Sequence, residues 1–201
     1  MAFIKLKENL PGIVGLIYYK RSTGKALCHF TQAGLRGPSP LTVTERELIA
    51  TYVSSLNECN FCVNIHGMVV NELAKDNGNT VACAINNIET PGISAKMRAL
   101  LNIAGKVQKS GKLVTEHDIK AAREHGATDE DIHDTVYIAA SFCFFNRYVD
   151  GLHTEPLRTE KDYVEPARSL LKFGYSYPNF IGRYFMKKLF RKYVKAESAT
   201  L

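Results

Sequence analysis

Apolar residues recur at intervals of three and four along most of this chain, the spacing of one face of an α-helix. Two such stripes are clear: Leu48, Ile49, Tyr52, Val53 and Leu56, and Met97, Leu100, Leu101, Ala104 and Val107. No convincing alternation of period two appears, and neither an internal repeat nor a low-complexity segment is present. The pattern therefore predicts an all-α protein.

Capping residues and helix breakers divide the pattern into elements. Thr44 with Glu47, Ser94, and Thr128 with Asp131 are typical helix starts. The capping box that begins at Thr44 also offers a purely structural explanation of Glu47. We expect helices over residues 44–56, 59–74, 80–88, 95–109, 116–125, 129–149, 163–173 and 179–195. Residues 1–40 contain many glycines and prolines, which predicts an irregular lead-in with one short helix over 23–33.

The segment 129–149 is apolar on most sides, so we expect it to be the buried central helix. With 201 residues the chain is long enough for one domain and an appendage. We assign residues 1–155 to a helical domain that includes the lead-in. Residues 156–201 are then a C-terminal helical extension.

The net charge of +6 equals the number of basic residues in one short run without acids. These residues are Arg183, Lys187, Lys188, Arg191, Lys192 and Lys195. They share one face of the last predicted helix, opposite Ile181, Phe185, Met186, Leu189, Phe190 and Tyr193. We expect the apolar face to pack within the protein's own oligomer while the charges stay in solvent, rather than a nucleic-acid site.

The chain's first residues lack the long apolar run of a secretory signal. The longest apolar run, 137–145, is too short to span a bilayer, so we expect no integral membrane association. Five cysteines, an odd number, are typical of a reducing compartment. We therefore expect a cytoplasmic protein.

The candidate chemistry lies in the octet from Cys59 to His66, which contains Cys59, Cys62 and His66. On a helix, residues three and four apart are neighbours, so the three side chains share one face. Glu47 lies twelve positions before Cys59 on the preceding predicted helix. Two thiols, an imidazole and a carboxylate are the parts of a dithiol redox site with a proton relay.

Two other interpretations use the same residues. Cys59, Cys62 and His66, with Glu47, could bind zinc in a metal-stabilised interaction module, although no second Cys/His pair is present. Alternatively the three residues only fill the core. Among thiols, the helix dipole alone favours Cys59 as the thiolate, whereas the proximity of His66 favours Cys62. We further expect Tyr52 to line the pocket, and Asn146, Arg147 and Asp150 to make a polar contact near it.

The arrangement of Glu47, Cys59, Cys62 and His66 resembles the alkylhydroperoxidase D signature of the carboxymuconolactone decarboxylase superfamily. The stretches 45–57 and 144–152 look like its peroxidase-related branch, and the resemblance covers residues 10–155. It implies a helical bundle that forms trimers or hexamers. We expect the protein to use no cofactor or metal. The resemblance also implies that Cys62 attacks a peroxide, with Glu47 and His66 as relay, and that Cys59 resolves the product before a dithiol reductant protein acts. The decarboxylase branch generally lacks the cysteine pair, so lactone decarboxylation is the alternative activity.

Overall fold

The computed structural model describes residues 2–8, 10–177 and 179–194 and confirms the all-α prediction, with 72% of residues helical. No strand occurs in these residues. The helices in chain order are α1 (Gly12–Tyr19), α2 (Arg21–Arg36), α3 (Val43–Leu56), α4 (Asn60–Ala74), α5 (Asn79–Asn86), α6 (Ala95–Lys109), α7 (Glu116–Glu124), α8 (Asp129–Gly151), α9 (Val164–Phe173) and α10 (Phe180–Val194), with short 3₁₀ turns η1 (Gly111–Leu113) and η2 (Glu160–Tyr163).

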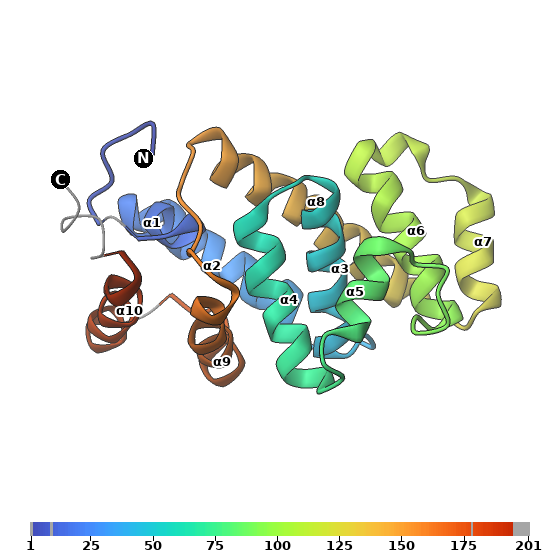
Figure 1. Cartoon of the computed structure of the whole chain (residues 1–201). Coiled ribbons are helices and arrows are strands. Elements are labelled where there is room, and N and C mark those ends of the chain that lie inside the picture. Colours follow the sequence, from blue (N-terminus) through green and yellow to red (C-terminus); the bar gives the residue numbers. More distant parts are fainter. Residues whose placement is uncertain (1, 9, 178, 195–201) are drawn as a thin grey trace.

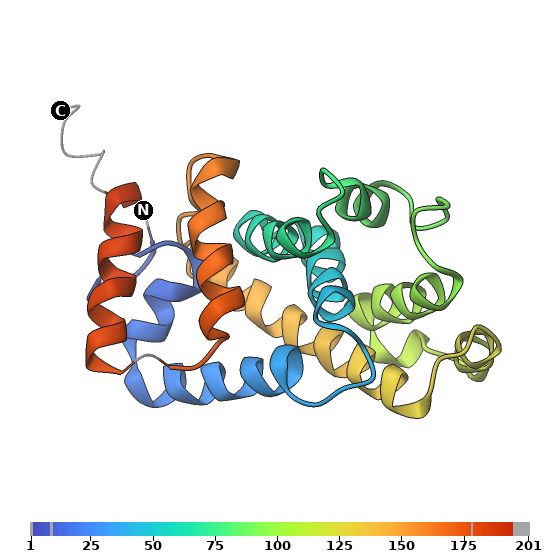
Figure 2. The same cartoon turned by 90° about the horizontal axis from the view of Figure 1, so that it is seen from below.

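The long helix α8 runs through the molecule and contacts α3 and α6 on one part of its length and α1 and α2 on another (Figure 1). Helices α6 and α7 lie at one end. Helices α9 and α10 lie side by side at the other end, near α1 and the N-terminal segment (Figure 2). The site helices α3 and α4 pack against each other between these two ends.

Buried apolar residues form two clusters. The scaffold cluster is centred on α3, α6 and α8, and its members include Leu48, Ile49, Val53, Leu100, Leu101, Ile103 and Ile138. The site cluster joins the N-terminal segment, the start of α4 and the C-terminal extension. It consists of Leu10, Tyr18, Cys59, Phe61, Cys62, Ile65, Val69, Val149, Leu157, Tyr163, Ala167 and Phe190. Both candidate cysteines therefore lie in the cluster that brings distant parts of the chain together.

The short helix predicted over 23–33 is confirmed as part of α2, but the irregular lead-in predicted around it was wrong, because α1 and α2 together occupy most of residues 12–36. Glycines in this segment serve close packing instead of loop formation. A Cβ at Gly34 would lie 2.4 Å from the Tyr137 ring, and one at Gly24 would lie 2.1 Å from the Ile17 carbonyl oxygen. Composition alone does not separate a glycine required by a neighbour from a glycine that breaks a helix.

The predicted capping box at Thr44 was also wrong, by two residues. Helix α3 begins at Val43, and Thr42 is its N-cap, with Glu45 completing the capping box. Glu47 therefore has no capping role and is fully buried. The caps at Ser94 and Thr128 are confirmed, since each side chain accepts the expected backbone N–H.

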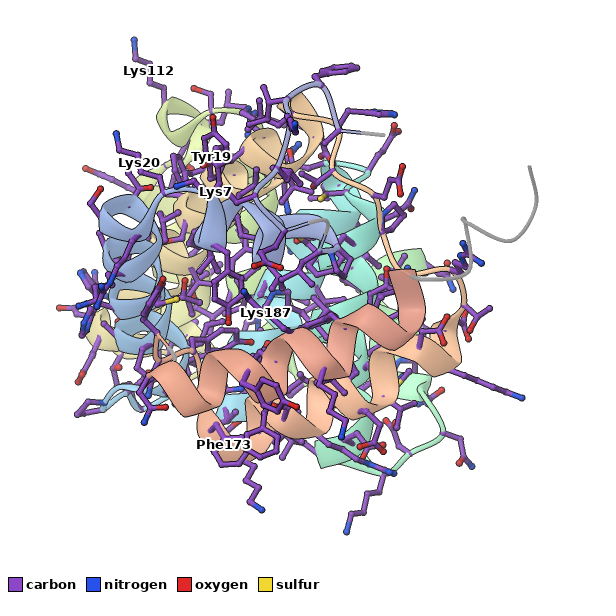
Figure 3. All side chains as sticks on the ribbon, turned by 90° about the vertical axis from the view of Figure 1, so that its left-hand side faces the viewer. Lys7, Tyr19, Lys20, Lys112, Phe173 and Lys187 are labelled. Atoms are coloured by element: carbon purple, nitrogen blue, oxygen red, sulfur yellow. The ribbon has the colours of Figure 1, made fainter. Side chains whose placement is uncertain are left out.

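The last helix lies close to its predicted range. Lys195 falls outside the described residues, as do the side chains at 180, 181, 183 and 191–194. Phe190 belongs to the site cluster and Met186 packs against it, whereas Phe185 is 62% exposed in the single chain. The packing of this apolar face within an oligomer stays a prediction. Figure 3 shows α10 across this end of the molecule, with Lys187 directed at the N-terminal segment, where it pairs with Glu8. No described helix combines the length and the apolar character needed to cross a membrane.

Candidate functional site

A tight turn between α3 and α4 sets the position of the first thiol. Glu58 adopts a left-handed conformation with φ of 57°, and the Cys59 backbone N–H donates to the Ser54 carbonyl at 3.0 Å. Cys59 thereby becomes the N-cap of α4, and Cys62 lies in the first turn of that helix. The predicted octet thus forms one helix start, with His66 one turn after Cys62.

The two cysteines are free thiols with adjacent sulfurs. Cys59 is fully buried and Cys62 is 3% exposed. A hydrogen bond that the Cys62 thiol donates to Cys59, burial, and the charges of Cys59 and Asp150 raise the pKa of Cys62 well above its ordinary value, while a hydrogen bond from Asn146 opposes them. Cys62 is therefore a protonated thiol at neutral pH, and its reaction as a nucleophile requires a base.

Polar side chains from α3 and α8 surround the sulfurs. Asn146 is buried, donates to the Ser54 hydroxyl at 3.1 Å and accepts from the Asn57 side chain at 2.9 Å. Asp150 accepts a hydrogen bond from the Cys59 thiol, and burial raises the Asp150 pKa. Arg147, by contrast, is exposed and donates to the Cys143 carbonyl, so the expected contact near the site involves Asn146 and Asp150 only.

Helix packing brings Glu47 of α3 to His66 of α4. The His66 Nδ1 atom lies 2.6 Å from Glu47 Oε2, and the imidazole meets the Phe142 ring edge-on at 4.7 Å. Since a carboxylate only accepts hydrogen bonds, Nδ1 carries the proton in the neutral imidazole. The other ring nitrogen, Nε2, is then an acceptor that can receive a proton.

Two further side chains hold Glu47, and sequence reasoning identified neither. Arg36 Nη1 lies 2.6 Å from Glu47 Oε1, and the Tyr175 hydroxyl donates to the same oxygen at 2.8 Å. Burial alone would raise the pKa of Glu47, but His66, Arg36 and Tyr175 together lower it below its ordinary value. Glu47 is thus a buried carboxylate. Such a group needs a cationic partner, but the spacing of residues around Glu47 in the sequence does not identify Arg36 as that partner.

An apolar cavity of about 130 Å³ adjoins the site. Its wall includes Cys62 and His66, whereas Cys59 does not line it. The expectation for Tyr52 was wrong, since Tyr175 takes that place while Tyr52 packs against the scaffold cluster. The other lining residues are Ile13, Val14, Ile17, Tyr18, Leu27, Cys28, Thr31, Phe61, Ile65, Phe142, Phe145, Pro166, Leu170, Gly174, Ser176, Met186 and Phe190.

A third thiol, Cys28, lies in the same wall. Burial raises the pKa of Cys28 to about 11, and no charged neighbour offsets that effect. Cys28 is therefore a packing residue in the reduced protein. Across the described ranges, no three His, Cys, Asp or Glu side chains are grouped to hold a metal ion, so the geometry gives the zinc interpretation no support.

Comparisons with known proteins identify the family and the fold of the chain. The family model described as the carboxymuconolactone decarboxylase family matches residues 22–104. A solved structure of an uncharacterised peroxidase-related protein from Ralstonia eutropha JMP134, described as an alkylhydroperoxidase AhpD core, is 31% identical. The alignment covers 79% of this chain and 81% of that protein, and the TM-score is 0.68.

Two other solved structures are similar. An uncharacterised peroxidase-related protein from Silicibacter sp. TM1040 is 27% identical over 73% of this chain and 76% of its own, with a TM-score of 0.68. A protein of unknown function from Agrobacterium tumefaciens shares the fold, with a TM-score of 0.58. It is 20% identical, and the alignment covers 69% of this chain and 94% of that protein. No functionally curated protein matches the chain with significance.

Proposed function

The chain belongs to the carboxymuconolactone decarboxylase superfamily and is alkylhydroperoxidase D-like, and from that premise we propose that it is a dithiol peroxidase. One observation carries the proposal. Cys62 and His66 line the same apolar cavity, and the far side of the His66 ring is held by the buried carboxylate of Glu47. A thiol, a base and a substrate-sized space are therefore adjacent.

The first step is the attack of Cys62 on the peroxide. His66 Nε2 takes the thiol proton, directly or through a water, and the thiolate attacks one peroxide oxygen. The O–O bond breaks, Cys62 becomes a sulfenic acid, and the leaving alkoxide takes the proton from His66 to leave as an alcohol. Sulfur is oxidised by two electrons and the peroxide is reduced by two.

The second step forms the disulfide. The Cys59 sulfur, adjacent to Cys62, attacks the sulfenic sulfur, and water leaves with the hydroxyl of the sulfenic acid and the Cys59 proton. A dithiol reductant protein then returns two electrons and two protons, which restores both thiols. The cavity supports this division of roles, because Cys62 lines it and Cys59 does not.

Glu47 acts on His66 without accepting its proton. Its lowered pKa keeps it ionised, and its ion pair with Arg36 makes protonation costly. The carboxylate orients the imidazole and stabilises the imidazolium that forms when Cys62 loses its proton, as the aspartate does in a serine protease triad. The relay in this proposal therefore has one mobile proton, on His66.

Paired thiols also favour redox chemistry over lactone decarboxylation, a reaction that does not consume a dithiol. We further propose that the subunit assembles as a trimer or hexamer, as its family resemblance implies. Large apolar side chains on the surface support assembly, among them Phe144 at 50% and Leu113 at 47% exposure. A monomer in light scattering at micromolar concentration would contradict the assembly.

The direct test is to count thiols on native protein before and after one equivalent of hydrogen peroxide or an alkyl hydroperoxide. We expect a loss of two thiols per chain and a Cys59–Cys62 disulfide in the peptide map. The matched control is Cys143→Ser, which leaves the pair intact and should lose the same two thiols. Unchanged thiol numbers with every peroxide would refute the proposed function.

A further inference from the structure

The C-terminal extension reaches into the thiol site through one side chain. The Tyr175 hydroxyl donates to Glu47 Oε1 at 2.8 Å and lies 3.2 Å from His66 Nδ1. Tyr175 and Glu47 are 128 positions apart in the chain. The tyrosine lies beyond residues 22–104, to which the family model extends, so the family match assigns it no role.

The backbone turn before Tyr175 directs this side chain toward Glu47 and His66. Helix α9 ends at Phe173, and Gly174 adopts φ of 64° and ψ of −155°, a conformation essentially restricted to glycine. A Cβ at Gly174 would lie 2.5 Å from the Gln32 side-chain oxygen. That same oxygen accepts the Tyr175 backbone N–H at 2.7 Å. The turn therefore leaves Phe173 exposed and directs Tyr175 inward.

The tyrosine ring contacts both neighbours of the carboxylate. It stacks on the His66 ring, with centroids 6.0 Å apart and planes 21° apart. The Arg36 guanidinium also lies over the tyrosine ring, 4.9 Å from its centroid. Glu47, His66 and Arg36 are thus held against a single residue of the extension.

The Tyr175 hydroxyl also sets which partners each carboxylate oxygen of Glu47 has. Oε1 receives Arg36 and Tyr175, which leaves Oε2 for His66. Burial and the charge of Glu47 raise the pKa of Tyr175 well above its ordinary value, so the hydroxyl stays a donor. Without it, the carboxylate can turn toward Arg36, and His66 loses the acceptor that fixes its tautomer.

We propose that Tyr175 is a positioning residue of the dithiol site, which holds Glu47 so that His66 presents its free nitrogen to Cys62. The active arrangement of α3 and α4 is then complete only when the turn after α9 is docked. The inference rests on the proposed function for the role of His66, but it concerns proton removal from Cys62 and can be tested without a peroxide.

The test measures alkylation of Cys62 by iodoacetamide in the reduced, full-length protein from pH 6 to 10, by peptide mass spectrometry. In the native protein, proton transfer to His66 gives a neutral-pH shoulder in the rate. Tyr175→Phe keeps the ring and removes the donor. Because a hydrogen bond to a charged group is lost, we expect the rate at pH 7 to fall about tenfold. The two rates should converge as pH rises and hydroxide removes the proton instead.

Two variants make the outcome decisive. Tyr52→Phe removes a half-buried tyrosine hydroxyl outside the site and should retain the native profile. Gly174→Ala moves Tyr175 with its hydroxyl intact and should also lose the shoulder. A native shoulder in Tyr175→Phe, or an equal loss at every pH, would overturn the inference. If the protein does not react with peroxide but Tyr175→Phe still slows alkylation of Cys62 at pH 7, the proposed function is refuted and the inference about Tyr175 stands.

Discussion

The scaffold cluster and the site cluster differ in how far apart in sequence their members lie. The scaffold cluster is centred on helices whose apolar stripes are visible in the sequence, and none of the proposed reacting groups belongs to it. The site cluster combines Leu10, Cys62 and Phe190, from the beginning, middle and end of the described chain. The thiols therefore depend on the docking of segments that α3 and α4 do not themselves position.

This difference has a consequence for reactivity. A small, mainly apolar cluster raises the pKa of Cys62, and the network of Glu47, Arg36 and Tyr175 at its edge supplies a charged acceptor for His66. Changes to the thiols, or to the polar network at the edge of the site cluster, should thus alter chemistry, and changes in the scaffold cluster should alter stability.

The largest expected effect follows removal of the thiols. Cys62→Ser should abolish peroxide consumption, because no other thiol lines the cavity beside both His66 and Cys59. Cys59→Ser should react once and retain a sulfenic acid on Cys62, without turnover. Peroxide consumption by stopped flow and dimedone labelling with mass spectrometry measure these outcomes. A sulfenic acid trapped on Cys59 in Cys62→Ser, with rapid peroxide loss, would exchange the two roles.

The next effect follows loss of the buried carboxylate. Glu47→Gln should slow the first step by about 10²–10⁴-fold at neutral pH, because His66 loses its charged partner. It also leaves Arg36 without a counterion, which should lower the free energy of unfolding by about 3–5 kcal/mol. Glu45→Gln is the matched control, since glutamine still serves in a capping box and should change neither quantity appreciably.

The pH dependence of the Glu47 effect has a defined sign. The folded-state pKa of Glu47 is lowered from 4.5, so its stabilisation is present above the unfolded pKa and is lost as pH falls through the folded one. Urea unfolding at pH 7 and pH 3 should therefore show a smaller difference between native protein and Glu47→Gln at the lower pH. A difference independent of pH would contradict the buried ion pair, and a normal rate in this variant would remove Glu47 from the mechanism.

A smaller effect separates the two parts of the C-terminal extension. Truncation after residue 177 removes the cavity wall supplied by Met186 and Phe190 but keeps Tyr175. We expect increased binding of a hydrophobic dye and lower solubility, with Cys62 alkylation at pH 7 retained. Truncation after residue 173 also removes Tyr175 and should lower that rate about tenfold. Equal rates in the two truncated proteins would show that the turn at Gly174 has no part in the site.

The smallest effect is expected in the scaffold. Burial would raise the pKa of Asp118, but Lys106 and the Thr115 capping interactions lower it to about 2. Asp118→Asn should reduce the free energy of unfolding by about 1 kcal/mol at pH 7, because the ion pair is partly exposed. This difference should be lost as pH falls from about 4 toward 2. The rate of Cys62 alkylation should stay unchanged. A changed rate would contradict the division of roles between the scaffold cluster and the site cluster.

The sequence by itself determined the helical class, most helix positions and the octet that opens α4. These features depend on interactions within one or two helical turns. Apolar periodicity, the caps at Ser94 and Thr128, and the spacing of Cys59, Cys62 and His66 all act over three or four residues.

Only the tertiary structure decided what Glu47 does and what surrounds Cys62. The sequence allowed a capping box at Thr44, and the actual box two residues earlier frees Glu47 to pair with Arg36. Glycine content suggested a loop where two helices pack closely, because the reason for a glycine such as Gly34 is Tyr137, a neighbour far along the chain. Tyr175 carries no local mark of its position, since its partners are reached only when the turn after α9 docks on α2 and α3. Long-range packing selects among residues that local patterns leave equivalent.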